Sequence, residues 1–380
     1  MTAEGLAVLL GATGLAWANG ANDVSKGIAT LVGAGVCDCR RAVAWGAACT
    51  GVGGLLGAVV AGAMLSTFGG GLLAEGVTPT LAAAVASLVG AAGQVLLSTR
   101  TGLPVSTTHA IVGALVGVGV VAFGVDAVAW PLLVGKVLLP LLVSPWVALA
   151  LTVFLLRILG RSDAATGGSE AAVDCACIDV GDPVPAGVPS PGAAAVARTP
   201  PSVVVSTGTS VECATDRPAA LAITIGGMHW LTSGATSMAR GMNDAPKIVA
   251  LAVMAAGLSG EASLPLPLLF AVVTAAMVGG SLVGGRRVTR VLAEDVTVMD
   301  HREGFVANLV TAALVCTGAL HGLPMSTTHV ATGGIFGAGV SNRRLDLGTL
   351  RRIALAWVVT LPGAALLGAL AWGALDGVLR

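Results

Sequence analysis

Two stretches of this chain, 220 residues apart, have nearly the same sequence. Residues 102–109 read GLPVSTTH and residues 322–329 read GLPMSTTH. Over the longer windows 102–120 and 322–340, 11 of 19 positions are identical. Self-similarity at a fixed offset indicates an internal duplication. The chain is therefore expected to fold as two related halves.

A second pair of polar motifs lies upstream at almost the same offset. The first half has Gly-Ala-Asn-Asp at 20–23 followed by Lys26, and the second has Gly-Met-Asn-Asp at 241–244 followed by Lys247. Both motifs stand inside otherwise apolar sequence. Duplicated polar motifs of this kind are typical of membrane transporters, whose sites draw on both repeats.

The composition places most of the chain in a membrane. Hydrophobic residues make up 55% of it and charged residues 11%, whereas soluble domains carry about 25% charged residues. The net charge of zero gives no indication of a nucleic-acid partner. The C-x-C pairs Cys37/Cys39 and Cys175/Cys177 are only a weak metal signal, because no histidines cluster near them in the sequence. The N-terminus lacks the basic start of a signal peptide.

Ten apolar runs are candidates for membrane segments, since a helix needs about 20 residues to cross a bilayer core. They are 5–36, 42–66, 80–99, 102–123, 130–156, 219–257, 265–284, 304–320, 322–340 and 353–375. Residues 161–218 interrupt this pattern with seven prolines and many small residues. Such a segment buries too little surface to fold alone, so we expect a flexible cytoplasmic linker there. It separates a first transmembrane repeat at 1–160 from a second at 219–380.

Loop charges predict how the two repeats are oriented, because Arg and Lys near membrane segments favour the cytoplasmic side. In three corresponding pairs of loops, one loop carries arginines and its counterpart carries none. The arginines concerned are Arg40, Arg41, Arg286, Arg287, Arg290, Arg302, Arg343, Arg344, Arg351 and Arg352. Equivalent loops therefore lie on opposite sides, and the second repeat is inverted. This places the N-terminus outside the plasma (inner) membrane and the linker in the cytoplasm.

Inversion requires an odd number of crossings in each half, and two arrangements satisfy it. Either 80–99 and 102–123 both cross, giving five spans per half, or they form a re-entrant hairpin with its tip at 100–108. We favour the hairpin because it puts the polar motif at membrane depth. The expected fold class is an all-α membrane protein of two inverted-topology repeats with broken helices and re-entrant hairpins.

The Ser-Thr-Thr motifs have the features of an anion site. Pro104 stops a helix arriving from the N-terminal side, and Ser106 is a good N-cap residue for the apolar helix that follows. A helix start offers unpaired N–H groups and the positive end of its dipole. Hydroxyl groups add further donors at Ser106, Thr107, Thr108, Ser326, Thr327 and Thr328. We therefore expect both motifs to hold an oxyanion.

The Asn-Asp motifs place carboxylates inside apolar segments, where an ionised group is costly unless it is paired or binds an ion. Their oxygens are hard ligands suited to Na⁺, and an aspartate could equally carry a proton. Gly20 and Gly241 allow the helices to break there. The candidate cation-coupling residues are Asn22, Asp23, Asn243 and Asp244.

Cationic side chains also stand near the motifs. Lys26 and Lys247 each follow an aspartate by three residues, so they either neutralise it or attract an anionic substrate. Together with Arg100 and Arg240 they leave a net charge of plus two against the two aspartates, which suits a divalent oxyanion. Arg100 is alternatively a cytoplasmic loop charge. The histidines after each hydroxyl motif, His109 and His329, either relay protons or cap their helices.

The four motifs together resemble the inorganic phosphate transporter (PiT) family over both halves, without the linker. The resemblance implies an inverted repeat whose hairpin tips and broken helices surround phosphate and its coupling ions. It also implies that the hydroxyls hold the anion and that the Asn-Asp pairs serve the cation. The chain departs from the commoner family pattern at Lys26 and Lys247, where that pattern has a second Asn, and two ammonium groups could displace Na⁺.

We therefore expect a secondary active transporter that carries inorganic phosphate across the plasma membrane by alternating access, coupled to H⁺ or Na⁺. The alternative is a permease for sulfate or another tetrahedral oxyanion. Ser and His three residues apart in both copies suit binding better than catalysis, so no enzyme is expected, and the chain offers no folded output domain for an anion sensor. Apart from the coupling ion no cofactor is expected, and a homodimer is compatible with the sequence. The expected substrate-binding residues are Ser106, Thr107, Thr108, Ser326, Thr327, Thr328, Asn22, Asn243, Lys26, Lys247 and Arg100, with Na⁺ at Asp23 and Asp244 as the one metal considered.

Overall fold

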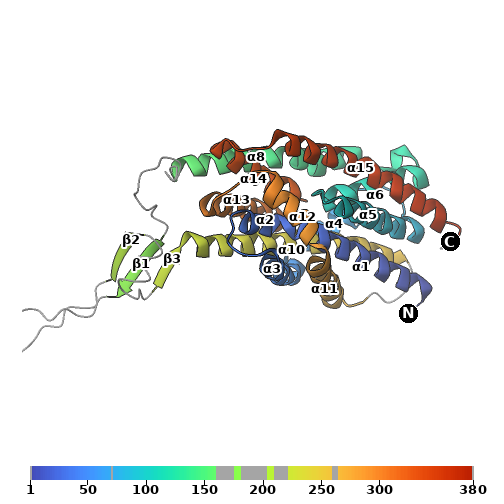
Figure 1. The fold of residues 1–380 in the computed structure, drawn as a ribbon. Helices are drawn as coiled ribbons and strands as arrows, with labels where there is room; N and C mark the ends of the chain where they lie inside the picture. Colours follow the sequence, from blue (N-terminus) through green and yellow to red (C-terminus); the bar gives the residue numbers. More distant parts are fainter. Residues whose placement is uncertain are drawn as a thin grey trace, which may run out of the picture.

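The structure is a computed structural model that describes residues 2–69, 72–159, 175–180, 203–208, 221–258 and 264–378. Helices form almost all of it (Figure 1). The first half contains α1 (Ala3–Asp23), α2 (Ser25–Gly33), α3 (Cys39–Val60), α4 (Gly62–Phe68), α5 (Leu81–Thr101), α6 (Thr107–Phe123), α7 (Trp130–Leu132) and, after a π-helical turn, α8 (Leu139–Ile158). The second half contains α10 (Ile225–Leu258), α11 (Leu266–Gly284), α12 (Arg286–Arg290), α13 (His301–Leu320), α14 (Thr327–Asn342) and α15 (Leu347–Leu375).

Six of these helical segments are long and apolar enough to cross a membrane. They are Cys39–Val60, Leu81–Thr101, Trp130–Ile158, Leu266–Gly284, His301–Leu320 and Leu347–Leu375. Large apolar side chains on the outer helices α8 and α15 remain exposed, among them Trp146 and Val358, each at 70%. Apolar side chains are stable in that position only against lipid or another protein surface. The described part of the chain is therefore an all-α membrane protein, apart from the small sheet between the halves.

Two of the three strands of that sheet lie where the sequence predicted a flexible linker, and the third, at 221–224, lies at the start of the run 219–257 that was predicted as a membrane segment. Strands β1 (Cys175–Val180), β2 (Val203–Gly208) and β3 (Leu221–Thr224) pair antiparallel in the order β2-β1-β3. Each strand contains β-branched residues, which favour extended pairing, and the proline-rich composition of the whole segment hid this local preference. The remaining residues of 161–218 lie outside the described residues.

Two helical hairpins, α5–α6 and α13–α14, carry the duplicated Ser-Thr-Thr motifs. Each hairpin turns at a glycine in the left-handed region, Gly102 with φ 80° and Gly322 with φ 67°, a conformation that costs other residues energy. The two tips touch inside the protein, where the Ser326 hydroxyl donates to the Ser106 hydroxyl at 2.9 Å. Tips that meet in the interior agree with the hairpin arrangement rather than with ten full crossings.

The two halves pack against each other through reciprocal glycine contacts. A Cβ added at Gly20 of α1 would overlap the carbonyl oxygen of Met277 in α11, and one at Gly241 of α10 would overlap that of Thr50 in α3. Small residues let helix backbones approach this closely in a membrane protein. In Figure 1, α1 and α10 pass through the centre in opposite directions, which agrees with the predicted inversion.

The hairpins are held by an equivalent pair of contacts. A Cβ at Gly113 of α6 would overlap the Leu361 carbonyl oxygen of α15, and one at Gly333 of α14 would overlap the Pro145 carbonyl oxygen of α8. Each of these hairpin helices is therefore packed on the last long helix of the other half. Gly117 and Gly337, four residues further along these helices, lie against the same two partner helices at Ala365 and Leu149.

Gly20 and Gly241 were expected to allow their helices to break, but neither helix breaks at its glycine. In the first half the helix is interrupted later, at Val24 between α1 and α2. In the second half α10 is continuous from Ile225 to Leu258, although it contains Pro246. Both glycines instead sit where two helix backbones touch, because only a residue without a side chain fits there.

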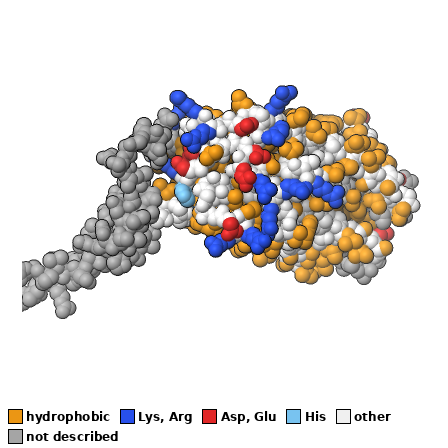
Figure 2. Space-filling view, in the orientation of Figure 1, with side chains coloured by type: hydrophobic (Ala, Val, Ile, Leu, Met, Phe, Trp, Pro, Cys, Tyr) orange, Lys and Arg blue, Asp and Glu red, His pale blue; other side chains and the backbone are white. Residues whose placement is uncertain are grey.

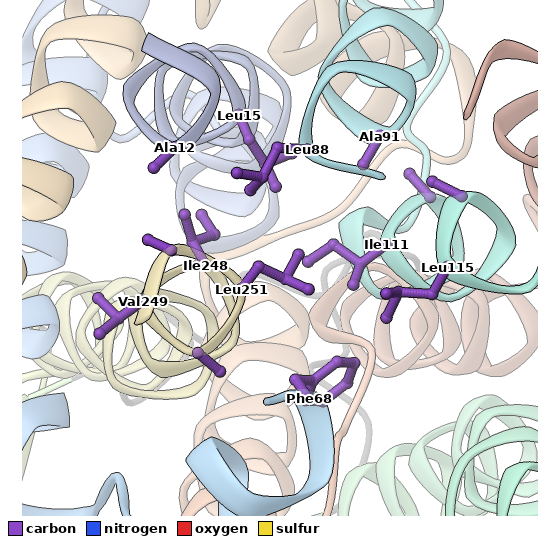
Figure 3. Packing of buried hydrophobic residues seen from close by; sticks show 14 of the residues in the cluster. Ala12, Leu15, Phe68, Leu88, Ala91, Ile111, Leu115, Ile248, Val249 and Leu251 are labelled. Carbon is purple, nitrogen blue, oxygen red and sulfur yellow. The ribbon is translucent and has the colours of Figure 1, made fainter. Parts of the chain in front are cut away.

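A large apolar cluster joins the two halves around the first hairpin, α5–α6. It combines Leu15 of α1, Leu88 of α5 and Ile111 of α6 with Ile248 and Leu251 of α10 (Figure 3). All five side chains are almost fully buried. This cluster fixes the positions of α1 and α10, which carry the two Asn-Asp motifs, relative to α6, which carries the first Ser-Thr-Thr motif.

The loops predicted to lie on the cytoplasmic side do lie together. Helix α12, which carries three arginines, contacts α2 and α3, and the side chain of Asn342 at the end of α14 donates to the Glu303 carboxylate at 3.1 Å. Figure 2 shows Lys and Arg side chains gathered over one part of this face, with hydrophobic side chains covering another part. Which of the two sides faces the cytoplasm stays a prediction.

Candidate functional site

The duplicated hydroxyl motifs begin two helices that face each other. Ser106 caps α6 by accepting from the His109 N–H at 3.2 Å, and Ser326 caps α14 by accepting from the His329 N–H at 3.3 Å. Because the two serine hydroxyls also bond to each other, the positive ends of both helix dipoles converge on one region. The six predicted hydroxyl residues are all at most 3% exposed: Ser106, Thr107, Thr108, Ser326, Thr327 and Thr328.

The last threonine of each motif reaches across to the opposite hairpin. The Thr328 hydroxyl donates to the Val105 carbonyl at 2.7 Å, and the Thr108 hydroxyl donates to the Met325 carbonyl at 3.4 Å. Val105 and Met325 are themselves equivalent positions of the repeat. The two tips therefore close on each other through a matched pair of side-chain-to-backbone bonds.

The Asn-Asp motif of the first half lies directly against its hairpin tip. Asp23 accepts from Lys26 at 2.5 Å and, through its other oxygen, from the Thr107 hydroxyl at 3.0 Å. The Asn22 side-chain nitrogen donates to the Leu103 carbonyl at 3.2 Å, and the Asn22 side-chain oxygen accepts from the Val105 N–H at 3.2 Å. The end of α1 and the start of α6 thus form one continuous polar cluster.

The second half repeats this cluster with looser connections. Asp244 accepts from Lys247 at 3.1 Å, and the Asn243 amide donates to the Met325 carbonyl at 2.9 Å. Lys247 also donates to the Thr108 hydroxyl at 2.9 Å, so it spans from its own motif to the hairpin of the other half. All these side chains are buried.

Asn19 joins the two clusters. Its amide nitrogen lies 3.0 Å from an oxygen of Asp23, 3.1 Å from the Thr107 hydroxyl and 3.1 Å from an oxygen of Asp244. The Arg240 guanidinium lies next to it and donates to the Asn19 carbonyl oxygen at 3.4 Å and to the Thr50 hydroxyl at 2.8 Å. The predicted cation ligands of both halves therefore belong to one site.

Several buried polar atoms in this site have hydrogen-bonding capacity to spare. Among the described residues, the unpartnered ones include the Thr327 hydroxyl, the Arg240 Nε and the side-chain oxygens of Asn19 and Asn243. Buried polar groups are nearly always paired in folded proteins. Two free donors and two free acceptors at the meeting point of two helix starts indicate a place for a polar ligand.

The charge of the site differs from the one predicted. Arg100 is exposed at the end of α5, where its backbone carbonyl accepts from Arg287 at 2.6 Å, and no contact of its side chain with the buried cluster is found. With ordinary ionisation, the buried cations Lys26, Lys247 and Arg240 against Asp23 and Asp244 leave a net charge of plus one. The predicted sum of plus two is therefore wrong for the buried cluster.

The two histidines pack behind the hydroxyls. Their rings lie 4.7 Å apart, and the His329 ring also stacks on Trp357 at 3.9 Å. His329 Nδ1 lies 2.7 Å from the Ser326 hydroxyl, so this ring orients the residue that caps α14. Both histidine backbones also complete the caps, as one of the two sequence interpretations expected.

Asn19 and Thr50 were not among the predicted site residues, and Arg240 was predicted only to contribute to the positive charge of the site. Asn19 is a lone amide one helical turn before Asp23, and it occupies the position equivalent to Arg240. Polar residues at these two equivalent positions were the sequence feature that could have indicated a role for Asn19 in the site. Thr50 gave no such indication, because a threonine in an apolar helix commonly bonds its own backbone.

No group of three or more His, Cys, Asp or Glu side chains that could hold a metal occurs in the part of the chain described here. Cys37 and Cys39 are free thiols. The Cys175/Cys177 pair lies in β1. The carboxylates expected to receive Na⁺ are instead each paired with the lysine three residues later in the chain.

Comparison with known proteins places the chain among transporters. The model of the phosphate transporter family matches residues 19–368. A probable low-affinity inorganic phosphate transporter of Mycobacterium tuberculosis is 29% identical over 97% of this chain and 76% of its own length. A putative phosphate permease of Pyrococcus horikoshii is 26% identical over 95% of both chains. The solved structure described as the sodium-dependent phosphate transporter matches all of both chains with a TM-score of 0.75 at 20% identity, and so has the same fold.

Proposed function

Because the chain belongs to the phosphate transporter family, a family of transporters rather than enzymes, we propose that it carries inorganic phosphate across the plasma membrane by alternating access, coupled to H⁺ or Na⁺. The observation that carries the proposal is the meeting of two hydroxyl-bearing helix starts beside both Asn-Asp motifs. Helix starts bind oxyanions through backbone N–H groups and the dipole. Here two of them share one buried region.

The groups of the site suit a protonated phosphate better than sulfate. The buried cluster has a net charge of plus one, which matches the monoanion of phosphate, whereas sulfate is divalent at neutral pH. Phosphate also carries O–H donors, for which the unpartnered oxygens of Asn19 and Asn243 are acceptors. A site built to accept such a hydrogen bond rejects an analogue that lacks it. Sulfate therefore remains the second candidate.

Alternating access is supported by the way the hairpins close the site. The bonds from Thr328 to Val105 and from Ser326 to Ser106 join one half to the other directly over the polar cluster. Phosphate cannot enter a site whose lining is almost fully buried unless these contacts part. We propose that they separate toward one side of the membrane at a time as the two halves rock.

Uptake of labelled phosphate into proteoliposomes tests the proposal. We expect uptake that an excess of unlabelled phosphate suppresses and an equal excess of sulfate suppresses much less. An imposed pH gradient and an imposed Na⁺ gradient, applied separately, identify the coupling ion. Absence of phosphate uptake under every gradient would contradict the proposal, and stronger suppression by sulfate would move the assignment to the second candidate.

Substitutions in the carboxylates tie the activity to this site. We expect Asp23→Asn and Asp244→Asn to reduce uptake at least tenfold each, since each removes the partner of a buried lysine. Asp126→Asn is the matched control, because this aspartate is exposed and lies away from the cluster, in the loop after α6. Full activity in both buried variants would show that the site is assigned wrongly.

A further inference from the structure

Lys26 and Lys247 have the surroundings of bound cations. We propose that their ammonium groups are permanent occupants of the two positions where an alkali coupling ion would bind, so that this transporter works without Na⁺. The inference rests on the phosphate transport proposed above and narrows its coupling. It depends on what surrounds each Nζ atom and on which charges lie nearby.

The Lys26 ammonium is enclosed by oxygens alone. Its Nζ lies 2.5 Å from the Asp23 carboxylate, 2.6 Å from the Asn22 side-chain oxygen, 3.1 Å from the Asn22 carbonyl and 3.3 Å from the Val105 carbonyl. A carboxylate, an amide oxygen and backbone carbonyls are the ligands that proteins use for hard cations. The side chain is fully buried, so the ammonium depends on these oxygens.

The Lys247 ammonium occupies the equivalent place in the second half. Its Nζ lies 2.8 Å from the Met325 carbonyl, 2.9 Å from the Thr108 hydroxyl and 3.1 Å from the Asp244 carboxylate. The aspartate and the hairpin carbonyl are the counterparts of those around Lys26. An aspartate and a hairpin carbonyl surround both lysines, Lys26 adds the two Asn22 oxygens, and Lys247 adds the Thr108 hydroxyl. Each half therefore forms an oxygen-lined position that suits a cation.

These positions do not fit an additional sodium ion. Each carboxylate already holds an ammonium, and Asp23 and Asp244 also share the Asn19 amide. An added Na⁺ would lie beside two lysines and the buried Arg240, and repulsion between like charges is strong away from water. The fixed ammonium groups supply the positive charge that an anion needs, so phosphate binding does not have to wait for a cation. Protons are then the remaining coupling ion.

Replacing Na⁺ in the uptake assay tests the inference on the unaltered protein. We expect proteoliposomes with a fixed pH gradient to take up phosphate at rates within about twofold whether the medium contains Na⁺ or choline. A tenfold or larger fall in choline would overturn the inference while leaving phosphate transport established. Absence of uptake in both media would instead contradict the proposed function.

A lysine variant provides the converse test. Lys26→Ala removes the ammonium but keeps the four oxygens around it, which we call the Lys26 cage. We therefore expect phosphate uptake to fall at least tenfold in choline and to recover in part with Na⁺ or methylammonium. Lys136→Ala is the matched control, because Lys136 is exposed and its loss should leave uptake unchanged in every medium. If neither cation restores phosphate uptake by the folded Lys26→Ala protein, the oxygens around Lys26 do not form a cation site.

Thermal unfolding gives a readout that does not depend on transport. A ligand that binds the folded state raises the melting temperature, so we expect Na⁺ to raise the Tm of Lys26→Ala over choline at equal ionic strength and to leave the unaltered protein unchanged. Stabilisation of the unaltered protein by Na⁺ would overturn the inference. If Lys26→Ala does not fold, phosphate uptake and Tm of the unaltered protein, each compared between Na⁺ and choline, still test the inference.

Discussion

Asn19 and Arg240 stand at equivalent positions in the two halves and have different chemistry. The Asn19 amide reaches both aspartates, whereas Arg240 brings a buried guanidinium that bonds the Asn19 carbonyl and Thr50. A strictly symmetric duplication would place two amides or two guanidiniums there. This single difference gives the site its third cation and its net positive charge.

Arg240 is therefore predicted to be needed for anion binding. We expect Arg240→Gln to raise the KM for phosphate at least tenfold, because the buried cluster then becomes neutral, and Arg240→Lys to recover part of the loss. Arg100→Gln is the control: its side chain is exposed, so uptake should stay within about twofold. A KM unchanged by Arg240→Gln would contradict the assignment, and a large effect of Arg100→Gln would restore that residue to the site.

The two central threonines are predicted to differ, although their motifs match. The Thr107 hydroxyl donates to Asp23 and accepts from Asn19, while the Thr327 hydroxyl has no partner. Thr107→Val should lower the stability by about 1–3 kcal/mol, since it leaves buried groups unpaired, and should also reduce uptake. Thr327→Val should raise the KM with little change in Tm. Thr101→Val, exposed near the same hairpin turn, is the control for both measurements, and equal behaviour of the two variants would refute the difference.

At the scale of the elements, the helical hairpins were predictable and the shape of the motif helices was not. Gly-x-Pro before Ser-Thr-Thr marks a helix end and a helix start in local sequence, so the hairpins could be predicted from a few residues. Whether a helix breaks at Gly20 or Gly241 depends on what packs against it. The sequence contains no sign that the Met277 and Thr50 carbonyls lie there.

The reciprocal packing predicts which glycines tolerate a methyl group. Gly113→Ala and Gly333→Ala should each destabilise the protein by about 1–3 kcal/mol, because the added Cβ would overlap a backbone oxygen that can move only with its helix. Gly14→Ala should be neutral or stabilising by up to about 1 kcal/mol, since nothing lies within 4 Å of its added Cβ and alanine favours helix. Thermal unfolding in detergent measures all three, and a Gly113→Ala protein as stable as Gly14→Ala would contradict the packing.

At the scale of the whole molecule, the fold and the meeting of the four motifs could be predicted from the duplication. The hydrogen bonds and ion pairs within the site could not. Repeated motifs in two halves predicted that Ser106 and Ser326 would come together, as they do. The partners of each charge depend on side-chain directions that no repeat specifies. Arg100 and Arg240 show this: both stand near a motif in the sequence, and only Arg240 turns inward.

The tip-to-tip contact predicts that tying the halves together stops transport. In a background without the other cysteines, Ser106→Cys with Ser326→Cys should cross-link on oxidation, because the two hydroxyls lie 2.9 Å apart. We expect phosphate uptake to fall to background on cross-linking and to return after reduction, with the cross-link verified by mass spectrometry. Each single cysteine variant is the control for oxidation. Transport at the full rate by cross-linked protein would exclude separation of the tips as a necessary step.

The crossed glycine contacts also bear on how the protein is made. Gly113 has its partner helix in α15 and Gly20 has its partner in α11, and both partner helices are synthesised well after the first half. The amino-terminal half thus enters the bilayer before the faces of α1 and α6 that contact α11 and α15 have been covered. Lipid or an insertion chaperone has to cover those faces until α11 and α15 have been synthesised, and a product truncated before α11 would expose them to membrane proteases.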